Sequence, residues 1–391
     1  MEKLWKYKKI GEVCIVERGA SPRPIDKYIT DNESGINWIK IGDTSDSMYI
    51  TETAQKIIVE GMKKSRYVKP GDFLLSNSMS FGRPYILKID GCIHDGWLVL
   101  RDENALFDKR FLYYYLSSKT TYKKLKSMAV GGVVNNLNSE MVRNVIVPVP
   151  DKEEQSEIAD LFDKIKKILD DRKQELEQLD TLVKSRFVEL FGDPVINSQG
   201  WKKALIGDDC FVTKLAGFEY TQYINYEDSG DVVMVKAQNV KNGKLNRKEL
   251  SFISNEVSDS LPRSQLAPGD VVMTYVGANI GDVAIIDNEY KYHLAPNVAK
   301  IRPDSERYNS IYFMYMLMLL NAYIVKNSAD TAKAALGMER IRKLNVFVPP
   351  MELQNQFADF VTSIDKSKSK IQKSLEETQL LFDSLMQKYF G

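Results

Sequence analysis

The sequence is one unit of about 195 residues written twice, and this duplication limits the fold more than any other feature. Matching residues follow the same order in both halves, and their separation stays between 196 and 201 positions. The matched pairs are Trp5 and Trp201, Ile10 and Ile206, Gly11 and Gly207, Cys14 and Cys210, Lys40 and Lys236, Asp72 and Asp270, Gly82 and Gly281, His94 and His293, Pro148 and Pro349, and Phe191 and Phe390. Such a series predicts two similar modules joined end to end, with loop insertions accounting for the drift.

Each unit begins with about 150 residues that alternate short apolar runs with turn residues. In the first copy, runs such as VCIVERG at 13–19, NWIKIGD at 37–43 and WLVL at 97–100 predict strands, because Gly, Pro, Asp and Asn separate them. One helix is expected over about 108–128. In the second copy the longest apolar stretch, 311–325, is too short to span a bilayer and predicts a buried helix.

Each unit ends with about 40 residues in which apolar side chains recur every 3.5 positions. The seam positions of the first copy are Ile158, Phe162, Ile165, Leu169, Leu176, Leu179, Val183 and Leu190, with Arg172 and Arg186 as exceptions. Those of the second copy are Phe357, Val361, Ile364, Ile371, Leu375, Phe382, Leu385 and Tyr389, with Lys368 and Thr378 as exceptions. A heptad period held this long is typical of a coiled-coil helix, and prolines before each segment mark where it can begin.

Together these patterns predict an α+β protein with two repeated mixed α/β globular domains, each followed by a long helix. The expected boundaries are 1–150 for the first domain, 151–192 for the first helix, 193–350 for the second domain and 351–391 for the second helix. A lone helix would leave its apolar stripe in water, so we expect the two to pair as an antiparallel coiled coil with pseudo-two-fold symmetry. The alternative is that each helix folds back on its own domain.

Cysteine usage and charge narrow the class of protein. Three cysteines stand far apart without a C-x-x-C pair, which excludes a disulfide scaffold and a zinc ribbon and predicts a cytoplasmic location. The net charge of +1 does not decide whether the chain binds nucleic acid, because such a role depends on how the charge is distributed. However, the first domain holds 23 basic and 17 acidic residues, the second 18 of each, and the two helices 13 basic and 18 acidic. Positive charge is therefore concentrated in the first domain.

The helix expected at 108–128 supplies candidate phosphate contacts. Its basic residues and tyrosines are Lys109, Arg110, Lys119, Lys123, Lys124, Lys126, Tyr113, Tyr114, Tyr115 and Tyr122. Basic and aromatic side chains in alternation suit phosphate neutralisation together with groove contact. The alternative is an ordinary amphipathic helix whose tyrosines face the core and whose lysines face solvent.

Two loops in each domain have the short hydrogen-bonding side chains expected of base readers. They are 76–83 (SNSMSFGR) and 131–136 (GGVVNN) in the first domain, and 274–281 (TYVGANIG) and 333–337 (KAALG) in the second. The residues predicted to contact DNA are Lys40, Asn77, Ser78, Ser80, Arg83, Lys119, Lys123, Lys124, Asn135, Asn136, Lys236, Gln238, Asn239, Tyr275, Asn279 and Lys333. Such loops also occur as plain turns. The two copies differ most here, as two recognition surfaces on one scaffold would.

Motifs of enzymes that act on DNA are missing from the sequence. There is no G-x-x-x-x-G-K-[ST] phosphate loop, no glycine-rich methyl-donor or dinucleotide turn, and no [ND]-P-P-[YFW] motif of amino-methyltransferases. The two histidines, His94 and His293, are repeat-equivalent, but Asp95 follows the first and Leu294 the second. We interpret both as structural or turn residues, because no carboxylate or cysteine cluster accompanies them. No set of metal ligands is evident.

The order, spacing and duplication of these features resemble the specificity subunit of Type I restriction-modification systems. The resemblance rests on the segment that closes each domain, 145–155 (VIVPVPDKEEQ) and 346–354 (VFVPPMELQ). The runs 38–43 (WIKIGD) and 94–97 (HDGW) also fit the family. The second copy departs from the pattern, since it keeps one residue of the acidic pair and has Gly-Met at 337–338 where the family has Asn-Leu.

Membership of that family implies that each globular domain is a target recognition domain reading one half of a bipartite, asymmetric double-stranded DNA sequence. The helices would form a spacer and dock two modification subunits. S-adenosylmethionine, ATP and Mg²⁺ would belong to those and to restriction subunits, so this chain would hold no cofactor and perform no catalysis. Two other hypotheses stay open, an enzyme combining recognition with methyl transfer and an interaction scaffold built on the coiled coil.

The length of the seam gives an expected spacing between the two half-sites. From 158 to 190 it covers about 48 Å at 1.5 Å per residue. Half-sites one helical turn apart face the same side of the duplex and fall within that limit, so we expect their centres roughly 10 base pairs apart.

Overall fold

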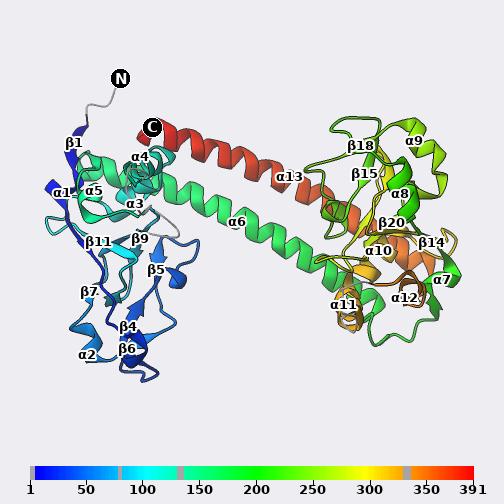
Figure 1. The fold of residues 1–391 in the computed structure, drawn as a ribbon, viewed down its shortest axis with the longest axis horizontal. Coiled ribbons are helices and arrows are strands. Elements are labelled where there is room, and N and C mark those ends of the chain that lie inside the picture. The colour runs from blue at the N-terminus through cyan, green and yellow to red at the C-terminus, as the bar shows by residue number, and fades with distance from the viewer. Residues whose placement is uncertain (1–4, 78–81, 130–135, 329–335) are drawn as a thin grey trace. The chain divides into compact units, whose positions relative to one another are not determined.

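A computed structural model describes residues 5–77, 82–129, 136–328 and 336–391 (Figure 1). It divides the chain into two compact units. The first consists of Met1–Lys173 and Lys373–Gly391, and the second of Gln174–Gln372. Each unit therefore combines one globular domain with part of both long helices.

Two five-stranded sheets form the first domain, with the strand orders β2-β11-β8-β9-β5 and β3-β6-β4-β10-β7. A short ribbon pairs β1 antiparallel with β12, so the first and last strands of the domain are neighbours. The strands are β1 (Lys6–Lys9), β2 (Ile15–Arg18), β3 (Ile29–Thr30), β4 (Ile36–Ile39), β5 (Tyr49–Ile50), β6 (Lys56–Ile57), β7 (Arg66–Val68), β8 (Phe73–Ser76), β9 (Pro84–Leu87), β10 (Gly91–Ile93), β11 (Trp97–Arg101) and β12 (Ile146–Val149). The helices are α1 (Ile10–Val13), α2 (Val59–Met62), α3 (Lys109–Ser117), α4 (Lys119–Ala129) and α5 (Ser139–Arg143).

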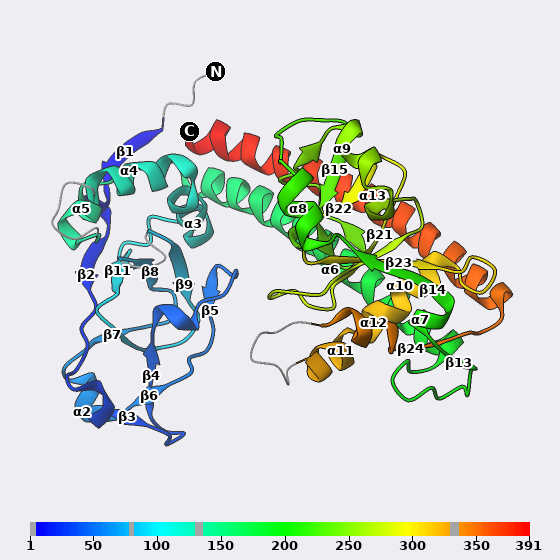
Figure 2. The same ribbon diagram turned by 45° about the vertical axis from the view of Figure 1, so that its right-hand side comes forward.

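Strand β8 shows how the layers of this domain are built. Phe73 and Leu75 face a core shared with α3, α4 and α5, whereas Leu74 faces a second core between the two sheets. Both faces of the strand are apolar because the sheet is covered on both sides. Figure 2 shows the resulting order of helices, first sheet and second sheet within this domain.

The second domain repeats this topology. Its sheets have the orders β14-β23-β20-β21 and β18-β15-β22-β19, which match β2-β11-β8-β9 and β6-β4-β10-β7. The parallel pair of β4 and β10 recurs as β15 and β22, and the ribbon of β1 and β12 recurs as β13 and β24. The duplication seen in the sequence is therefore a duplication of the fold.

The elements of the second domain have the following bounds. The strands are β13 (Lys203–Leu205), β14 (Cys210–Lys214), β15 (Val232–Val235), β16 (Val240–Lys241), β17 (Lys244–Leu245), β18 (Phe252–Ile253), β19 (Gln265–Leu266), β20 (Val271–Thr274), β21 (Val283–Ile285), β22 (Lys291–Leu294), β23 (Val298–Pro303) and β24 (Asn345–Phe347). The helices are α7 (Ile206–Asp209), α8 (Gly217–Tyr223), α9 (Asn255–Ser260), α10 (Ser310–Leu319), α11 (Asn321–Ser328) and α12 (Met338–Arg342).

The helix that the sequence predicted over about 108–128 is broken in two, so the prediction of one helix there was wrong. The segment 108–128 is interrupted at Ser118, whose backbone is extended, and it forms α3 and α4. Ser118 is 2% exposed, and its hydroxyl accepts a hydrogen bond from the backbone N–H of Thr121 at 3.1 Å. A serine that caps a helix in this way favours the start of a new helix over continuation of the preceding one. The segment 311–325, predicted as a buried helix, is helical over α10 and α11, which meet at Leu320, a residue whose backbone stays in the right-handed helical region.

A long helix follows each domain, as predicted. These are α6 (Lys152–Phe191) and α13 (Met351–Phe390), of 40 residues each. Every predicted seam position of both helices is buried or half-buried. One exception to the heptad pattern, Lys368, forms an ion pair with Asp180 of the other helix, which explains how a charged residue is accommodated there.

Contacts within each unit show that the helices run antiparallel. In the first unit the ring of Phe162, near the start of α6, lies 5.5 Å from that of Phe382, near the end of α13. In the second unit Phe357, near the start of α13, lies 5.4 Å from Phe187, near the end of α6. These contacts confirm the predicted pairing. The sequence pattern missed Phe187, which is fully buried in the core of the second domain although it is outside the heptad seam.

Candidate nucleic-acid interface

In the first domain, a backbone hydrogen bond joins the described ends of the two loops predicted to read bases. The backbone N–H of Leu137 donates to the carbonyl of Asn77 at 3.1 Å and so joins the end of the second loop to the start of the first. Gly82 closes the first loop by donating to the carbonyl of Ser76 at 2.8 Å, with a φ of 69° that favours glycine. A β-carbon at Gly82 would lie 3.4 Å from Leu125 of α4. We call α4 and the described residues of this region, namely Ser76, Asn77, Gly82, Arg83, Asn136 and Leu137, the loop cluster.

The second domain builds the same loop cluster from loops of different sequence. Leu336 donates to the carbonyl of Tyr275 at 2.8 Å, and Gly281 to that of Thr274 at 2.8 Å. Helix α11 takes the place of α4, and its Asn321 amide donates to the Asp282 carboxylate at 3.4 Å. Because the same backbone bonds recur, the scaffold brings the loops together and leaves their side chains free to differ.

Arg83 is well placed for contact with a ligand at the first loop cluster. Its side chain is exposed, donates to Asp46 at 3.1 Å, and lies 5.5 Å from the centre of the Tyr85 ring. Asn136, in the second loop, is half-buried. Ser78, Ser80 and Asn135 were also predicted to contact DNA, and they lie outside the described residues.

Asn77 and Asn239 were predicted as base contacts, but both are buried. Asn77 is 1% exposed and donates from its amide to the carbonyl of Asp95 at 2.8 Å. Asn239 is 2% exposed and donates to the carbonyl of Asn246 at 2.9 Å. Their side chains hold neighbouring loops in place, so in this structure they support the surface and do not face a ligand.

The lysines of α4 lie on the outside of the loop cluster. Lys123, Lys124 and Lys126 are exposed. Lys119 is exposed over 81% of its side chain and pairs with Asp383 at 2.9 Å. Of the tyrosines on α3 and α4, Tyr114 and Tyr115 are buried in the core and Tyr122 is 43% exposed. The core interpretation thus holds for Tyr114 and Tyr115, and the lysines form a basic edge.

Lys40 and Lys236 occupy equivalent places in the two domains and are held in the same way. The Lys40 ammonium donates to the side-chain carbonyl of Gln55 at 2.8 Å, and that of Lys236 donates to the Ser251 hydroxyl at 2.8 Å. Both lysines are half-buried. A neutral partner leaves the positive charge uncompensated at that contact, which suits an anionic or electron-rich ligand.

The remaining predicted residues of the second domain differ in their exposure. Gln238 is exposed beside Lys236, and Asn279 is exposed at the tip of the first loop. Tyr275 is half-buried under the ammonium of Lys214, which lies 5.5 Å from the ring centre. Lys333 lies outside the described residues.

The interpretation of the two histidines as structural or turn residues stays a prediction, and the structure places both at least half-buried. His293 is fully buried, and burial lowers its pKa. His94 is half-buried, its Nδ1 accepts a hydrogen bond from the backbone N–H of Gly96 at 2.6 Å, and burial lowers its pKa too. Burial therefore favours the neutral form of both imidazoles.

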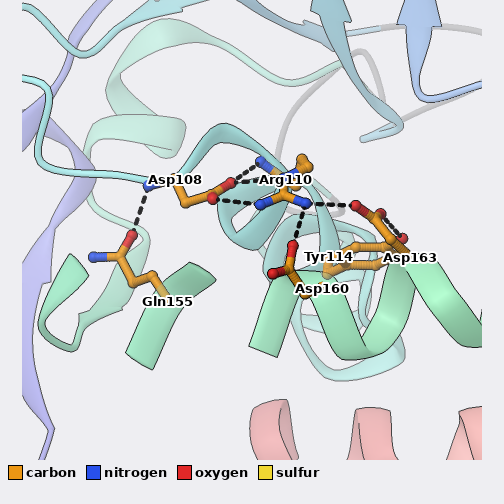
Figure 3. Close-up of polar contacts among 6 residues, drawn as sticks. All are labelled: Asp108, Arg110, Tyr114, Gln155, Asp160 and Asp163. Atoms are coloured by element: carbon orange, nitrogen blue, oxygen red, sulfur yellow. Dashed lines mark hydrogen bonds and ion pairs between the residues drawn. The ribbon is translucent and has the colours of Figure 1, made fainter. Parts of the chain in front are cut away.

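A buried glutamine locks each domain to the start of its helix, a role that the sequence pattern did not reveal. The side-chain carbonyl of Gln155 accepts from the backbone N–H of Asp108 at 2.7 Å (Figure 3), and its amide donates to the carbonyls of Leu106 at 3.0 Å and Pro150 at 2.9 Å. Gln155 is fully buried.

Gln354 repeats this lock in the second domain. It accepts from Asn309 at 2.8 Å and donates to the carbonyls of Arg307 and Pro349 at 2.9 Å each. Gln354 is also fully buried. Three equivalent hydrogen bonds explain why the domain-closing segment ends in glutamine in both copies, since only an amide both donates and accepts in this way.

The first domain adds a charged clamp to its lock. The guanidinium of Arg110 donates to Asp160 at 2.6 Å and Asp163 at 2.7 Å on α6, and to Asp108 at 2.9 Å (Figure 3). The hydroxyl of Tyr114 donates to Asp163 at 2.6 Å. Although partial burial opposes ionisation of Asp108, hydrogen bonds from Arg110 lower its pKa. At the second domain, an exposed pair between Lys244 and Asp365 at 2.7 Å joins the domain to α13.

Two further features are absent from the described residues. No group of three or more His, Cys, Asp or Glu side chains there could hold a metal ion. Within the same residues, no helix has the length and apolar character needed to cross a membrane.

Comparison with known proteins identifies the family of the chain. The model of the family described as the Type I restriction modification DNA specificity domain matches the chain twice, over residues 2–179 and 199–378. The Type I restriction enzyme MjaVIII specificity subunit of Methanocaldococcus jannaschii is 23% identical over 398 residues, which cover 95% of this chain and 90% of that protein.

Solved structures share the fold over nearly the whole chain. A chain from work on complex assembly and conformational transition of the type I R-M system superposes with a TM-score of 0.64 at 17% identity, covering 99% of this chain and 97% of that one. The S subunit of a Type-I restriction-modification system from M. genitalium superposes with a TM-score of 0.58 at 14% identity, covering 99% of this chain and 96% of that one.

Proposed function

Because the chain belongs to the family of the Type I restriction modification DNA specificity domain, we propose that it selects the DNA sequence on which such a system acts. Each globular domain reads one half of a bipartite, asymmetric double-stranded target, and the chain itself performs no catalysis. The observation that most supports this proposal is the duplicated loop cluster, in which one backbone scaffold presents two different sets of side chains.

At the first domain, Arg83 and Asn136 contact bases, and the α4 residues Lys119, Lys123 and Lys124 contact phosphates. Exposed lysines on a helix edge neutralise phosphates without reading sequence, whereas arginine and asparagine recognise base edges. At the second domain, the contacts come from Lys236, Gln238, Tyr275 and Asn279. The charge difference between the domains implies that the first contributes more of the sequence-independent affinity.

The paired helices act as the spacer between the two readers and as the docking site of two modification subunits. Those subunits bring S-adenosylmethionine, and restriction subunits bring the ATP- and Mg²⁺-dependent activities. The glutamine locks support the spacer role, because a rigid joint at each domain transmits the helix length to the distance between half-sites.

The test is selection from a randomised duplex library by the full chain in complex with its modification subunits. We expect a bipartite motif with an unread spacer and half-site centres roughly 10 base pairs apart. Inserting one heptad after Glu175 and one after Ser374 lengthens the helices by about 10 Å. The preferred spacer should then change by up to about 3 base pairs, or binding should be lost through misrotation.

Other outcomes would contradict the proposal. Binding of S-adenosylmethionine by the isolated chain would favour the enzyme hypothesis. Binding of the modification subunits without any sequence selection on DNA would favour the scaffold hypothesis. An unchanged spacer in the heptad variant with full affinity would show that the helices do not set the distance.

A further inference from the structure

The first domain contains a cleft beside its loop cluster. The cleft has a volume of about 810 Å³, and Arg23, Lys40, Gln55 and Asp95 are among the residues that line it. It adjoins the loop cluster directly, because the buried amide of Asn77 donates to the backbone carbonyl of Asp95 at 2.8 Å. Whatever contacts the loop cluster is therefore within reach of this cleft.

Three polar residues on one wall of the cleft form a connected set, which we call the Arg23 triad. The hydroxyl of Ser21 donates to one oxygen of the Asp95 carboxylate at 2.9 Å, and the guanidinium of Arg23 donates to the other at 3.2 Å. The backbone N–H of Asp95 in turn donates to the Ser21 hydroxyl at 3.2 Å. The carboxylate is therefore fixed from two sides, and it orients the arginine.

The Arg23 triad has donors left for a ligand. The Arg23 side chain is 80% exposed and that of Asp95 is 44% exposed. Among the described residues, Asp95 is the one polar partner of the guanidinium. Since a guanidinium has five N–H donors, Arg23 can donate two parallel hydrogen bonds to a pair of acceptors while Asp95 holds it.

A G·C base pair complements this arrangement better than a phosphate does. In the major groove, guanine presents two acceptors, N7 and O6, and its cytosine partner presents an amino donor. Arg23 supplies donors to the guanine, and the Asp95 carboxylate beside it can accept from the cytosine. A phosphate would meet the same carboxylate as a like charge, which disfavours it.

The Arg23 triad has no counterpart in the second domain. The shift between the copies is 196 both at Cys14 and at Lys40, so Gly217 stands in the place of Ser21 and Glu219 in the place of Arg23. Leu294 replaces Asp95 after the equivalent histidine. Glu219 reverses the charge and is itself paired with Arg263 at 3.3 Å.

We propose that Arg23, held by Asp95 and Ser21, reads a guanine in the half-site contacted by the first domain, and that the second domain has no equivalent contact. This inference rests on the proposed function and names one base of its target. It adds Ser21, Arg23 and Asp95 to the residues that determine specificity.

The test repeats the library selection with Arg23→Ala, Arg23→Lys and Asp95→Asn, in complex with the modification subunits. The matched control is Lys27→Ala, which removes an exposed positive charge from the same segment without touching the triad. We expect Arg23→Ala to reduce the preference for guanine at one position of one half-site by tenfold or more. Arg23→Lys should retain part of that preference, Asp95→Asn should weaken it, and Lys27→Ala should leave it intact.

Each contrary result has a distinct meaning. A uniform loss of affinity in Arg23→Ala and Lys27→Ala, with the guanine preference retained, would overturn the proposal in favour of a phosphate contact. Failure of Arg23→Ala to assemble with the modification subunits would identify the cleft as a protein-docking site and would also overturn it. If the unmodified complex selected no sequence at all, the proposed function itself would fail before any variant was compared. Thermal unfolding of each variant shows whether its fold is intact.

Discussion

The two globular domains share their framework and differ at their reading surface. Both have the same order of the four strands that their corresponding sheets share, and the fully buried Gln155 and Gln354 make the same three hydrogen bonds in each. At the surface, by contrast, Arg23 in one copy corresponds to Glu219 in the other. Positions whose polar atoms are buried are constrained by the cost of an unsatisfied hydrogen bond, whereas exposed positions bear no such cost.

The joints between domain and helix show the same division. The glutamine lock is buried and common to both domains, while the ion pairs around it differ. The first domain has a multiple clamp at Arg110, whereas at the second domain Lys244 forms an exposed ion pair with Asp365 of α13. A charged contact at the periphery can therefore change between copies without altering the joint.

Exchanging one domain tests whether the reading surfaces are independent, and it should have the largest effect. Replacing residues 195–345 with those of another family member should replace one half-site and leave the other unchanged, because each domain has its own core and loops. Affinity for the original second half-site should fall by about 10³-fold or more, since several base contacts are lost together. Sequencing of selected DNA gives the answer, and a hybrid with both halves altered would contradict the modular arrangement.

Removing the lock tests whether the shared framework is equally important in both copies. Gln155→Leu and Gln354→Leu each leave one backbone N–H and two carbonyls without their partner, so each should cost about 3 kcal/mol in the free energy of unfolding. Urea denaturation of the purified chain measures it. The control Gln356→Leu changes an exposed glutamine in the same turn of α13 as Gln354, and it should cost less than about 0.5 kcal/mol. Unequal losses in the two variants would show that the locks are not equivalent.

Removing the ion pairs between each domain and its long helix tests whether they stabilise the first domain more than the second. Arg110→Ala should cost about 2 kcal/mol near pH 7, because three carboxylates lose a partly buried partner. Lys244→Ala, at an exposed pair, should cost about 1 kcal/mol or less.

The cost of Arg110→Ala should also depend on pH. The pKa of Asp108 is lowered in the folded protein, so its contribution is present above the unfolded value of about 3.9 and is lost as the pH falls through the folded value. The difference between Arg110→Ala and the unmodified chain should therefore shrink below about pH 4. Denaturation across a pH series measures this, and a constant difference would exclude Asp108 as the linked group.

The smallest effect is expected from the basic edge of the first domain. Alanine at Lys123, Lys124 or Lys126 should weaken binding by a similar factor for all sequences and reduce the log–log salt slope by about 1 each. Lys119→Ala is the internal comparison, since Asp383 already partly neutralises that lysine. Salt titration of DNA binding measures the slopes, and wild-type slopes at all four positions would place these lysines on a plain solvated face.

Periodicity and order are properties of the sequence alone, and they determined the architecture. The ordered matches established the duplication, and the heptad seam predicted two helices that pair, because an apolar stripe must be buried somewhere. The breaks at Ser118 and Leu320 could not be predicted in this way. At Ser118 the capping hydroxyl has a local effect that an apolar pattern does not reveal.

The composition of the interface was decided only by the tertiary structure. Asn77 and Arg83 stand in one polar loop, yet the fold buries the first and exposes the second. Ser21 and Arg23 meet Asp95 across more than 70 positions of sequence, and Gln155 reaches back to Asp108 in the same way. Which polar side chains face a ligand and which support the loops depends on such long-range hydrogen bonds, and these form only when the sheets and helices have packed.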